Sequence, residues 1–178
     1  MYCLQTTSIT SDIAHKTDVG GVELNIADAA ALKTAAREIL DRVGKKHPSA
    51  RLNGILVQRM EKGLAEIILG FKRDPQVGPV VVLGIGGVLA EIYKDFTAWL
   101  APVSVNDAAK MITEVKGLAT IRGYRGMLRG DCAALAQTVS AFSQLAFIDS
   151  IAEAEINPPL VKAEGSGVVA VDDLIVQR

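Results

Sequence analysis

Three stretches of the chain carry apolar residues at the spacing of an amphipathic helix. The first covers residues 28–43, where the Asp28 side chain can accept hydrogen bonds from the first free backbone N–H groups. The second begins at Ser104 and Asp107, which stand three residues apart as in a capping box. Asp131 precedes the third in the same way. The pattern therefore predicts three capped helices, each with one buried face.

Short runs rich in Val, Ile and Leu lie between the first two helices, and glycine or proline separates them. The predicted strands there are residues 54–60, 66–73, 79–83 and 88–93. Their connections are too short for a crossover helix, so the sheet should be largely antiparallel. Two more strands are expected after the third helix, at residues 152–156 and 167–172. Strands, then helices, then strands indicate an α+β fold rather than a Rossmann alternation.

Composition and charge narrow the class of protein. Of the 178 residues, 49% are hydrophobic and 22% are charged, which predicts a packed core rather than disorder. The net charge is −1 and there is no basic stripe, which argues against a nucleic-acid partner. The apolar runs are too short to cross a bilayer, and the first residues lack the pattern of a secretory signal. Cys3 and Cys132 lack metal-ligand spacing, so a cytoplasmic protein without disulfides is expected.

Residues suited to phosphate chemistry gather between His15 and Val22. Gly20 and Gly21 allow backbone N–H groups to approach an anion closely. The neutral imidazole of His15 is a nucleophile that can carry a phosphoryl group, and Lys16 can offset its negative charge. A surface turn with an incidental histidine is the alternative interpretation of these residues.

Two oxygen ligands for a hard cation stand at Asn157 and Asp172, on strands that should adjoin. Two such ligands leave most of an octahedral shell to water and nucleotide phosphates, which is how Mg²⁺ is usually held. Glu155 should project to the same face as Asn157 if the strand continues that far. The alternative is that Asn157-Pro158 begins a turn and Asp172 is a solvated acid at a strand end.

Three segments together resemble the ATP-grasp domain of the NDP-forming, succinyl-CoA synthetase-like acyl-CoA synthetases. They are Asp12-Ile-Ala-His-Lys-Thr-Asp-Val-Gly-Gly-Val22, Gly78-Pro-Val-Val-Val-Leu-Gly-Ile-Gly-Gly-Val-Leu-Ala-Glu91, and Glu155-Ile-Asn-Pro158 followed by Asp172. The resemblance runs from about Asp12 to the end of the chain. It implies an ATP-grasp fold in which residues 1–60 are a remnant of the smaller lobe. Residues 61–178 would form the larger lobe with the metal site.

The resemblance also implies roles for individual residues. His15 would receive a phosphoryl group from a CoA-binding partner and pass it to the nucleotide, while Asn157 and Asp172 would ligate magnesium. The implied nucleotide or phosphate contacts are Lys16, Gly20, Gly21, Gln58, Met60, Glu66, Arg73, Gly86, Gly87 and Arg125, with Glu91 as an acidic neighbour. The implied cofactors are ATP or ADP with Mg²⁺. The implied partner is a CoA-binding synthetase subunit or domain, because this chain carries none.

The beginning of the chain departs from the family pattern. Family members carry an N-terminal subdomain that ends in a strand whose lysine binds nucleotide phosphate, whereas Thr7 or a neighbour stands here. The chain is therefore expected to be N-terminally truncated, and loss of the lysine would cost on the order of 10²-fold in rate. A missing subdomain would also expose apolar surface, which a homo-oligomer could cover.

Three functions remain open from the sequence. The chain is the nucleotide-binding component of an acyl-CoA synthetase, a catalytically impaired remnant that acts as a binding or assembly module, or a regulatory synthetase-like domain of a protein acetyltransferase. The retained His15, Asn157 and Asp172 favour the first function. The missing lysine and subdomain favour the second.

Overall fold

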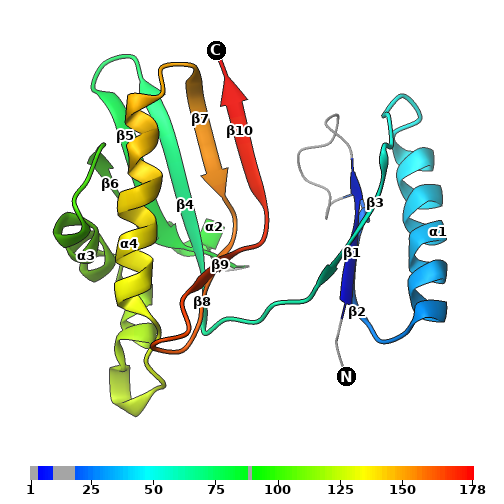
Figure 1. The fold of residues 1–178 in the computed structure, drawn as a ribbon, viewed down its shortest axis with the longest axis horizontal. Helices are drawn as coiled ribbons and strands as arrows, with labels where there is room; N and C mark the ends of the chain where they lie inside the picture. Colours follow the sequence, from blue (N-terminus) through cyan, green and yellow to red (C-terminus); the bar gives the residue numbers. More distant parts are fainter. Residues whose placement is uncertain (1–3, 10–18, 88–89) are drawn as a thin grey trace. The chain divides into compact units, whose positions relative to one another are not determined.

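The chain forms two compact units, Met1–Met60 and Glu61–Arg178, in the computed structural model of Figure 1. The structure describes residues 4–9, 19–87 and 90–178. In that part of the chain, no helix combines the length and apolar character needed to cross a membrane.

The first unit is a three-stranded antiparallel sheet with one long helix against it. Its elements are β1 (Leu4–Ile9), β2 (Val22–Ile26), α1 (Ala29–Lys46) and β3 (Gly54–Arg59), and the strand order is β2-β1-β3. Ile39 and Val43 of α1 are fully buried and pack with Val19, Leu52 and Ile55. The Asp28 carboxylate accepts a hydrogen bond from the Ala31 N–H at 2.8 Å, so the predicted cap is confirmed.

The second unit is built around an antiparallel sheet with strand order β10-β7-β4-β5-β6. These strands are β4 (Ala65–Asp74), β5 (Gly78–Ile85), β6 (Phe96–Leu100), β7 (Ile151–Ile156) and β10 (Asp173–Gln177). Two short strands, β8 (Pro159–Val161) and β9 (Val168–Ala170), extend the sheet because β8 pairs with the start of β4. The expectation of an antiparallel α+β fold is confirmed, since every strand pair between described residues is antiparallel.

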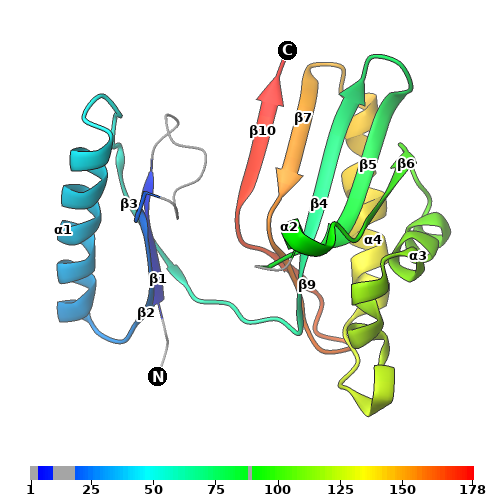
Figure 2. The same cartoon turned by 180° about the vertical axis from the view of Figure 1, so that it is seen from behind.

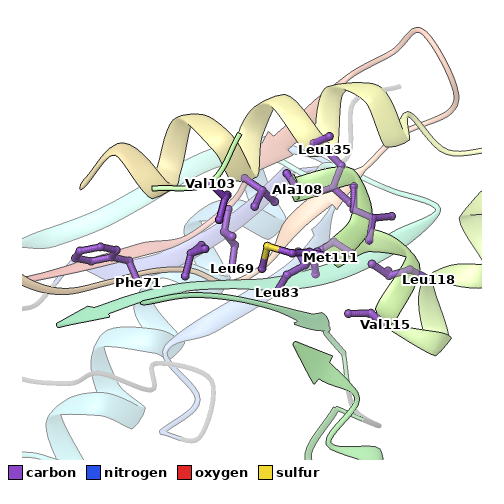
Figure 3. Close-up of a cluster of buried hydrophobic side chains, with 14 of the residues drawn as sticks. Leu69, Phe71, Leu83, Val103, Ala108, Met111, Val115, Leu118 and Leu135 are labelled. Carbon is purple, nitrogen blue, oxygen red and sulfur yellow. The ribbon is translucent and has the colours of Figure 1, made fainter. Parts of the chain in front are cut away.

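The helices that follow β6 cover one face of this sheet. The helical elements after β6 are α3 (Val105–Glu114), η1 (Lys116–Arg122), η2 (Tyr124–Gly126), α4 (Cys132–Ser143) and η3 (Gln144–Phe147). Figure 3 shows Leu69 and Leu83 of the sheet packed beneath Met111 of α3 and Leu135 of α4, all fully buried. Seen from behind in Figure 2, α3 and α4 lie beyond the sheet. The alternate residues of β4, such as Ile68 and Gly70, therefore point to the opposite, open face.

One predicted strand is wrong. Residues 90–93, inside the expected strand 88–93, form the short helix α2 (Ala90–Tyr93), and the strand comes later as β6. Asp95 explains the shift, because its carbonyl accepts a hydrogen bond from the Ile85 N–H at 3.1 Å and its carboxylate accepts the N–H groups of Lys116 and Gly117. These bonds hold the chain beside β5 from Asp95 onward, so pairing begins at Phe96.

Candidate nucleotide and metal site

Asn157 and Asp172 lie side by side at neighbouring strand ends. β7 and β10 are paired, with Ile156 opposite Asp173, and the Asn157 N–H donates a hydrogen bond to the Asp172 carbonyl at 3.0 Å. The register places Leu174 opposite Glu155 on the open face, whereas Asp173 alternates to the helix-covered face. The two predicted metal ligands are therefore brought together, and Asp173 points away from Glu155.

The donor set at these strand ends suits a hard cation. The Asn157 Nδ2 donates to Glu155 Oε1 at 2.9 Å, which leaves the amide oxygen of Asn157 as an acceptor. The Asp173 N–H donates to Asp172 Oδ1 at 3.1 Å, and both predicted ligands are exposed. The described residues contain no cluster of three or more His, Cys, Asp or Glu side chains able to hold a metal. An amide and a carboxylate oxygen fit Mg²⁺ that takes its remaining ligands from water and phosphate.

Glu66 and the glycine turn lie at the same end of the sheet. Glu66 pairs with Leu160 of β8, and its carbonyl accepts a hydrogen bond from the Gly86 N–H at 2.7 Å. A Cβ at Gly86 would come within 3.0 Å of the Glu66 backbone, and Gly87 has a φ of +81° that favours glycine. The start of β4 is thus bordered by this turn on one side and on the other by the chain that runs from Asn157 to β8.

Arg73 makes contacts other than the one predicted for it. Its guanidinium was expected on phosphate, yet its Nε donates to the Ile151 carbonyl at 2.9 Å. Its Nη2 donates to the carbonyls of Leu145, Ala146 and Ile148 at 3.2, 2.9 and 3.0 Å. The side chain is 17% exposed and lies 5.6 Å from the Phe71 ring centroid, on the helix-covered face. These bonds hold the connection between α4 and β7, so Arg73 has a structural role.

Arg125 lies in the loop between η1 and α4. It sits in η2 with a φ of 51°, and its guanidinium stacks 5.4 Å from the Tyr124 ring centroid. The loop is attached to the β8–β9 turn, where the Glu164 N–H donates to the Arg129 carbonyl at 3.0 Å. The bond of Arg129 thus ties the end of the loop that carries Arg125 to the β8–β9 turn.

The candidates of the first unit lie in and near its sheet. Gly20 has a φ of +72°, and a Cβ there would approach Arg42 Nε to 3.3 Å, while Gly21 is buried. Gln58 lies in β3, and Met60 follows that strand. His15 and Lys16 fall outside the described residues, as does the side chain of Glu91 in α2. The nucleotide contacts implied for these residues remain predictions.

A groove on the open face was not foreseen from the sequence. It has a volume of about 170 Å³ and passes over Gly70, whose missing side chain leaves the space. Its other lining residues on this face are Lys72, Val82, Glu153, Glu155, Leu174 and Val176. Lys72 Nζ lies 2.8 Å from Glu153 Oε1, and this hydrogen bond raises the pKa of Lys72. The sequence signal for this groove was the alternation of side chains along the strands. It could be interpreted only once the strand order β10-β7-β4-β5 was known.

Comparison with known proteins decides the family. Residues 4–176 match the sequence profile of the ATP-grasp domain. The chain belongs to the ATP-grasp family. This ATP-grasp chain is 36% identical to the ADP-forming acetate–CoA ligase II subunit beta of Pyrococcus furiosus over 172 residues. The aligned residues cover 96% of this chain and 73% of that subunit. The predicted family and fold are confirmed.

Two further relatives show how much of each protein the similarity covers. The ADP-forming acetate–CoA ligase I of Archaeoglobus fulgidus is 41% identical over 165 residues, which are 92% of this ATP-grasp chain and 24% of that protein. The chain thus spans about a quarter of that relative. The structure of the dinucleotide-forming acetyl-coenzyme A synthetase 1 of Candidatus Korarchaeum cryptofilum, with coenzyme A and Ca-AMPCP, superposes with a TM-score of 0.90. That pair is 35% identical, covering 98% of this chain and 76% of the other.

Proposed function

We propose that this chain is the nucleotide- and Mg²⁺-binding component of an NDP-forming acyl-CoA synthetase. Such an enzyme converts acyl-CoA, NDP and phosphate into the free acid, NTP and CoA. The observation that carries the proposal is the pairing of Asn157 with Asp172, at the end of the sheet where Glu66 and the Gly86–Gly87 turn also lie. Support comes from two relatives that are ADP-forming acetate–CoA ligases and from the similar acetyl-coenzyme A synthetase 1, whose structure holds coenzyme A and Ca-AMPCP.

The residues at the strand ends have distinct roles in this proposal. The Asn157 amide oxygen and the Asp172 carboxylate hold the cation, which when bound offsets the charge of the nucleotide phosphates. In the glycine turn we assign the Gly87 N–H to the same anion, because the Gly86 N–H is bonded to the Glu66 carbonyl. We assign the lobes as the resemblance implied, with residues 1–60 from the smaller lobe and 61–178 forming the larger one.

His15 is the proposed phosphoryl carrier. Its ring nitrogen forms a bond to phosphorus as the bond to a histidine of the CoA-binding partner breaks. The terminal oxygen of the bound NDP then takes the phosphoryl group, which returns His15 to its neutral form. A CoA-binding subunit or domain is therefore the required partner. The cytoplasm, where such nucleotides are found, is the proposed location.

Calorimetry with ADP, in excess Mg²⁺ or in EDTA, tests the nucleotide site. We expect the chain to bind MgADP more tightly than ADP, because the cation joins Asp172 to the phosphates. Asn157→Ala and Asp172→Ala should each weaken MgADP binding about tenfold or more while leaving binding in EDTA unchanged. Asp173→Ala is the matched control, since that carboxylate faces away. No binding at millimolar nucleotide would overturn the proposal and favour the assembly module.

The phosphoryl carrier has its own test within the same proposal. Incubation with a CoA-binding synthetase subunit, acyl-CoA and radiolabelled phosphate should label the chain at His15. His15→Ala should remove the label and keep the affinity for MgADP. A label that persists in this variant would refute the role of His15. Absence of label in the wild type, despite MgADP binding, would favour the impaired module, in which Thr7 or a neighbour stands in place of the family's lysine.

A further inference from the structure

The Asn157 side chain has two ends of similar shape but opposite chemistry. Rotation about its last side-chain torsion is broad and roughly two-fold, so the amide can present either its oxygen or its NH₂ group. Only the oxygen can ligate a cation. A cation site that depends on Asn157 therefore needs something that selects one of the two orientations.

Glu155 makes that selection in the structure. Its Oε1 accepts a hydrogen bond from Asn157 Nδ2 at 2.9 Å, and an ionised carboxylate accepts hydrogen bonds but donates none. The nitrogen end of the amide therefore turns toward Glu155, and the oxygen end turns away. Asn157 comes directly after β7 and stands two residues from Glu155. In an extended chain, this spacing places both side chains on one face.

The surroundings leave Glu155 available for this contact. It is half-buried in β7, between Gly70 of β4 and Leu174 of β10, and neither neighbour is charged. Within the described part of the chain, Glu155 has no ion-pair partner, whereas Glu153 on the same face is paired with Lys72 at 2.8 Å. The backbone of Asn157 is fixed separately by its hydrogen bond to the Asp172 carbonyl. Glu155 thus acts on the amide orientation rather than on the strand.

We propose that Glu155 is a positioning residue that turns the Asn157 amide so that Oδ1 faces the cation. The inference rests on the proposed function, because it assigns Glu155 to the cation site of Asn157 and Asp172. Removal of a group that orients a metal ligand typically lowers metal affinity 10–100-fold. The measured quantity is the ratio of the dissociation constants for ADP in EDTA and for MgADP, which isolates the contribution of the cation.

Three single variants give the first arm of the test. Glu155→Ala should lower this ratio about tenfold, while the affinity for ADP in EDTA stays the same. Glu155→Gln should keep most of the ratio, because the glutamine carbonyl can still accept from Asn157 Nδ2. Glu153→Ala, on the same strand and face, is the matched control and should leave the ratio unchanged. An unchanged ratio in Glu155→Ala would overturn the inference.

The decisive arm is a double-mutant cycle with Asn157→Asp. A carboxylate presents an oxygen in either orientation, so it needs no positioning. Adding Glu155→Ala to the Asn157→Asp variant should therefore not lower the ratio of dissociation constants. Relief of charge repulsion between the two carboxylates should instead raise this ratio slightly. If Glu155 instead ligated the cation directly, its removal would lower the ratio by a similar factor in both backgrounds. That result would overturn the positioning role.

A metal-free measurement completes the test. In ¹⁵N–¹H spectra, one side-chain amide proton of Asn157 should be shifted by its bond to Glu155. The shift should be lost in Glu155→Ala and kept in Glu153→Ala, and its persistence in Glu155→Ala would contradict the inference. A wild type without Mg²⁺-dependent binding overturns the proposed function and the inference with it. Mg²⁺-dependent binding that Glu155→Ala leaves intact overturns the inference alone.

Discussion

At the scale of single residues, Arg73 and Asn157 show two uses of a fixed hydrogen-bonding geometry. The sequence placed Arg73 on phosphate because a guanidinium fork suits that anion. The structure uses the same donors on carbonyls that lie 72 to 78 residues away along the chain. The adjacency of Asn157 and Asp172 could be predicted because a local motif carries each of them, whereas their role as metal ligands stays a prediction. The partners of Arg73 could not be predicted, since they depend on how α4 and β7 are connected.

The role of Arg73 predicts a large effect on stability and none on binding. Arg73→Ala should lower the free energy of unfolding by about 2–3 kcal/mol, because several poorly solvated carbonyls lose their donor. Arg73→Lys should recover only part of this, since an ammonium lacks the planar fork. Urea denaturation measures both variants. A weaker affinity for MgADP in folded Arg73→Ala, with unchanged stability, would instead support the phosphate contact expected from the sequence.

At the scale of elements, the three long helices could be predicted, whereas the short helix α2 and several strands could not. Asp28, Ser104 and Asp131 each accept the N–H of the residue three positions later, so the signals for the helix starts are local. Strands β1, β2, β6, β8 and β10 were missed because a strand of three to six residues is defined by its neighbours in the sheet.

Asp131 connects two elements, and its lowered pKa predicts that the stability of the protein depends on pH. Its carboxylate accepts the Ala134 N–H at 3.0 Å, which caps α4, and the Gly167 N–H at 2.9 Å, which holds the β8–β9 turn. The Ala134 bond first, and then the Gly167 bond, lower the pKa of Asp131. Because the pKa of Asp131 is lower in the folded protein, its contribution to stability is complete above its ordinary pKa of about 4. That contribution is lost as the pH falls through the pKa of the folded state.

The comparison of wild type with Asp131→Asn isolates this effect. The difference in free energy of unfolding should be largest near neutral pH and should shrink as the pH falls below about 4. Urea denaturation from pH 7 to pH 3 measures it, and other acidic groups cancel because both proteins contain them. A difference that stays constant over this range would show that the charge of Asp131 does not matter.

At the scale of the whole molecule, β10 leaves an apolar edge. Leu174, Ile175 and Val176 are 54%, 54% and 40% exposed, and no described strand pairs with the outer side of β10. Exposed apolar edge strands tend to pair with other chains. Two copies of β10 paired antiparallel about Ile175 would set Leu174 against Val176 on each side. This pairing is self-complementary, as a two-fold dimer requires.

We therefore expect self-association that depends on concentration. Sedimentation velocity at about 5 and 200 µM should show a larger species at the higher concentration, in line with modest edge pairing. Ile175→Lys should abolish it by placing a charge at the centre of the pairing. Val77→Lys, at an equally exposed position in the β4–β5 turn, is the control and should still associate. A wild type that stays monomeric at both concentrations would contradict this prediction.

The central place of β4 has a consequence for how the protein folds. β4 pairs with β5, the next strand along the chain, and with β7, which comes after six helical segments. Contacts between near neighbours in sequence form with less loss of chain entropy, so the Glu66 carbonyl meets Gly86 early in folding. Asn157 and Asp172 reach the start of β4 only after the long loop between β5 and β7 has closed. A nucleotide and cation held by both this pair and the glycine turn should therefore slow unfolding without speeding folding.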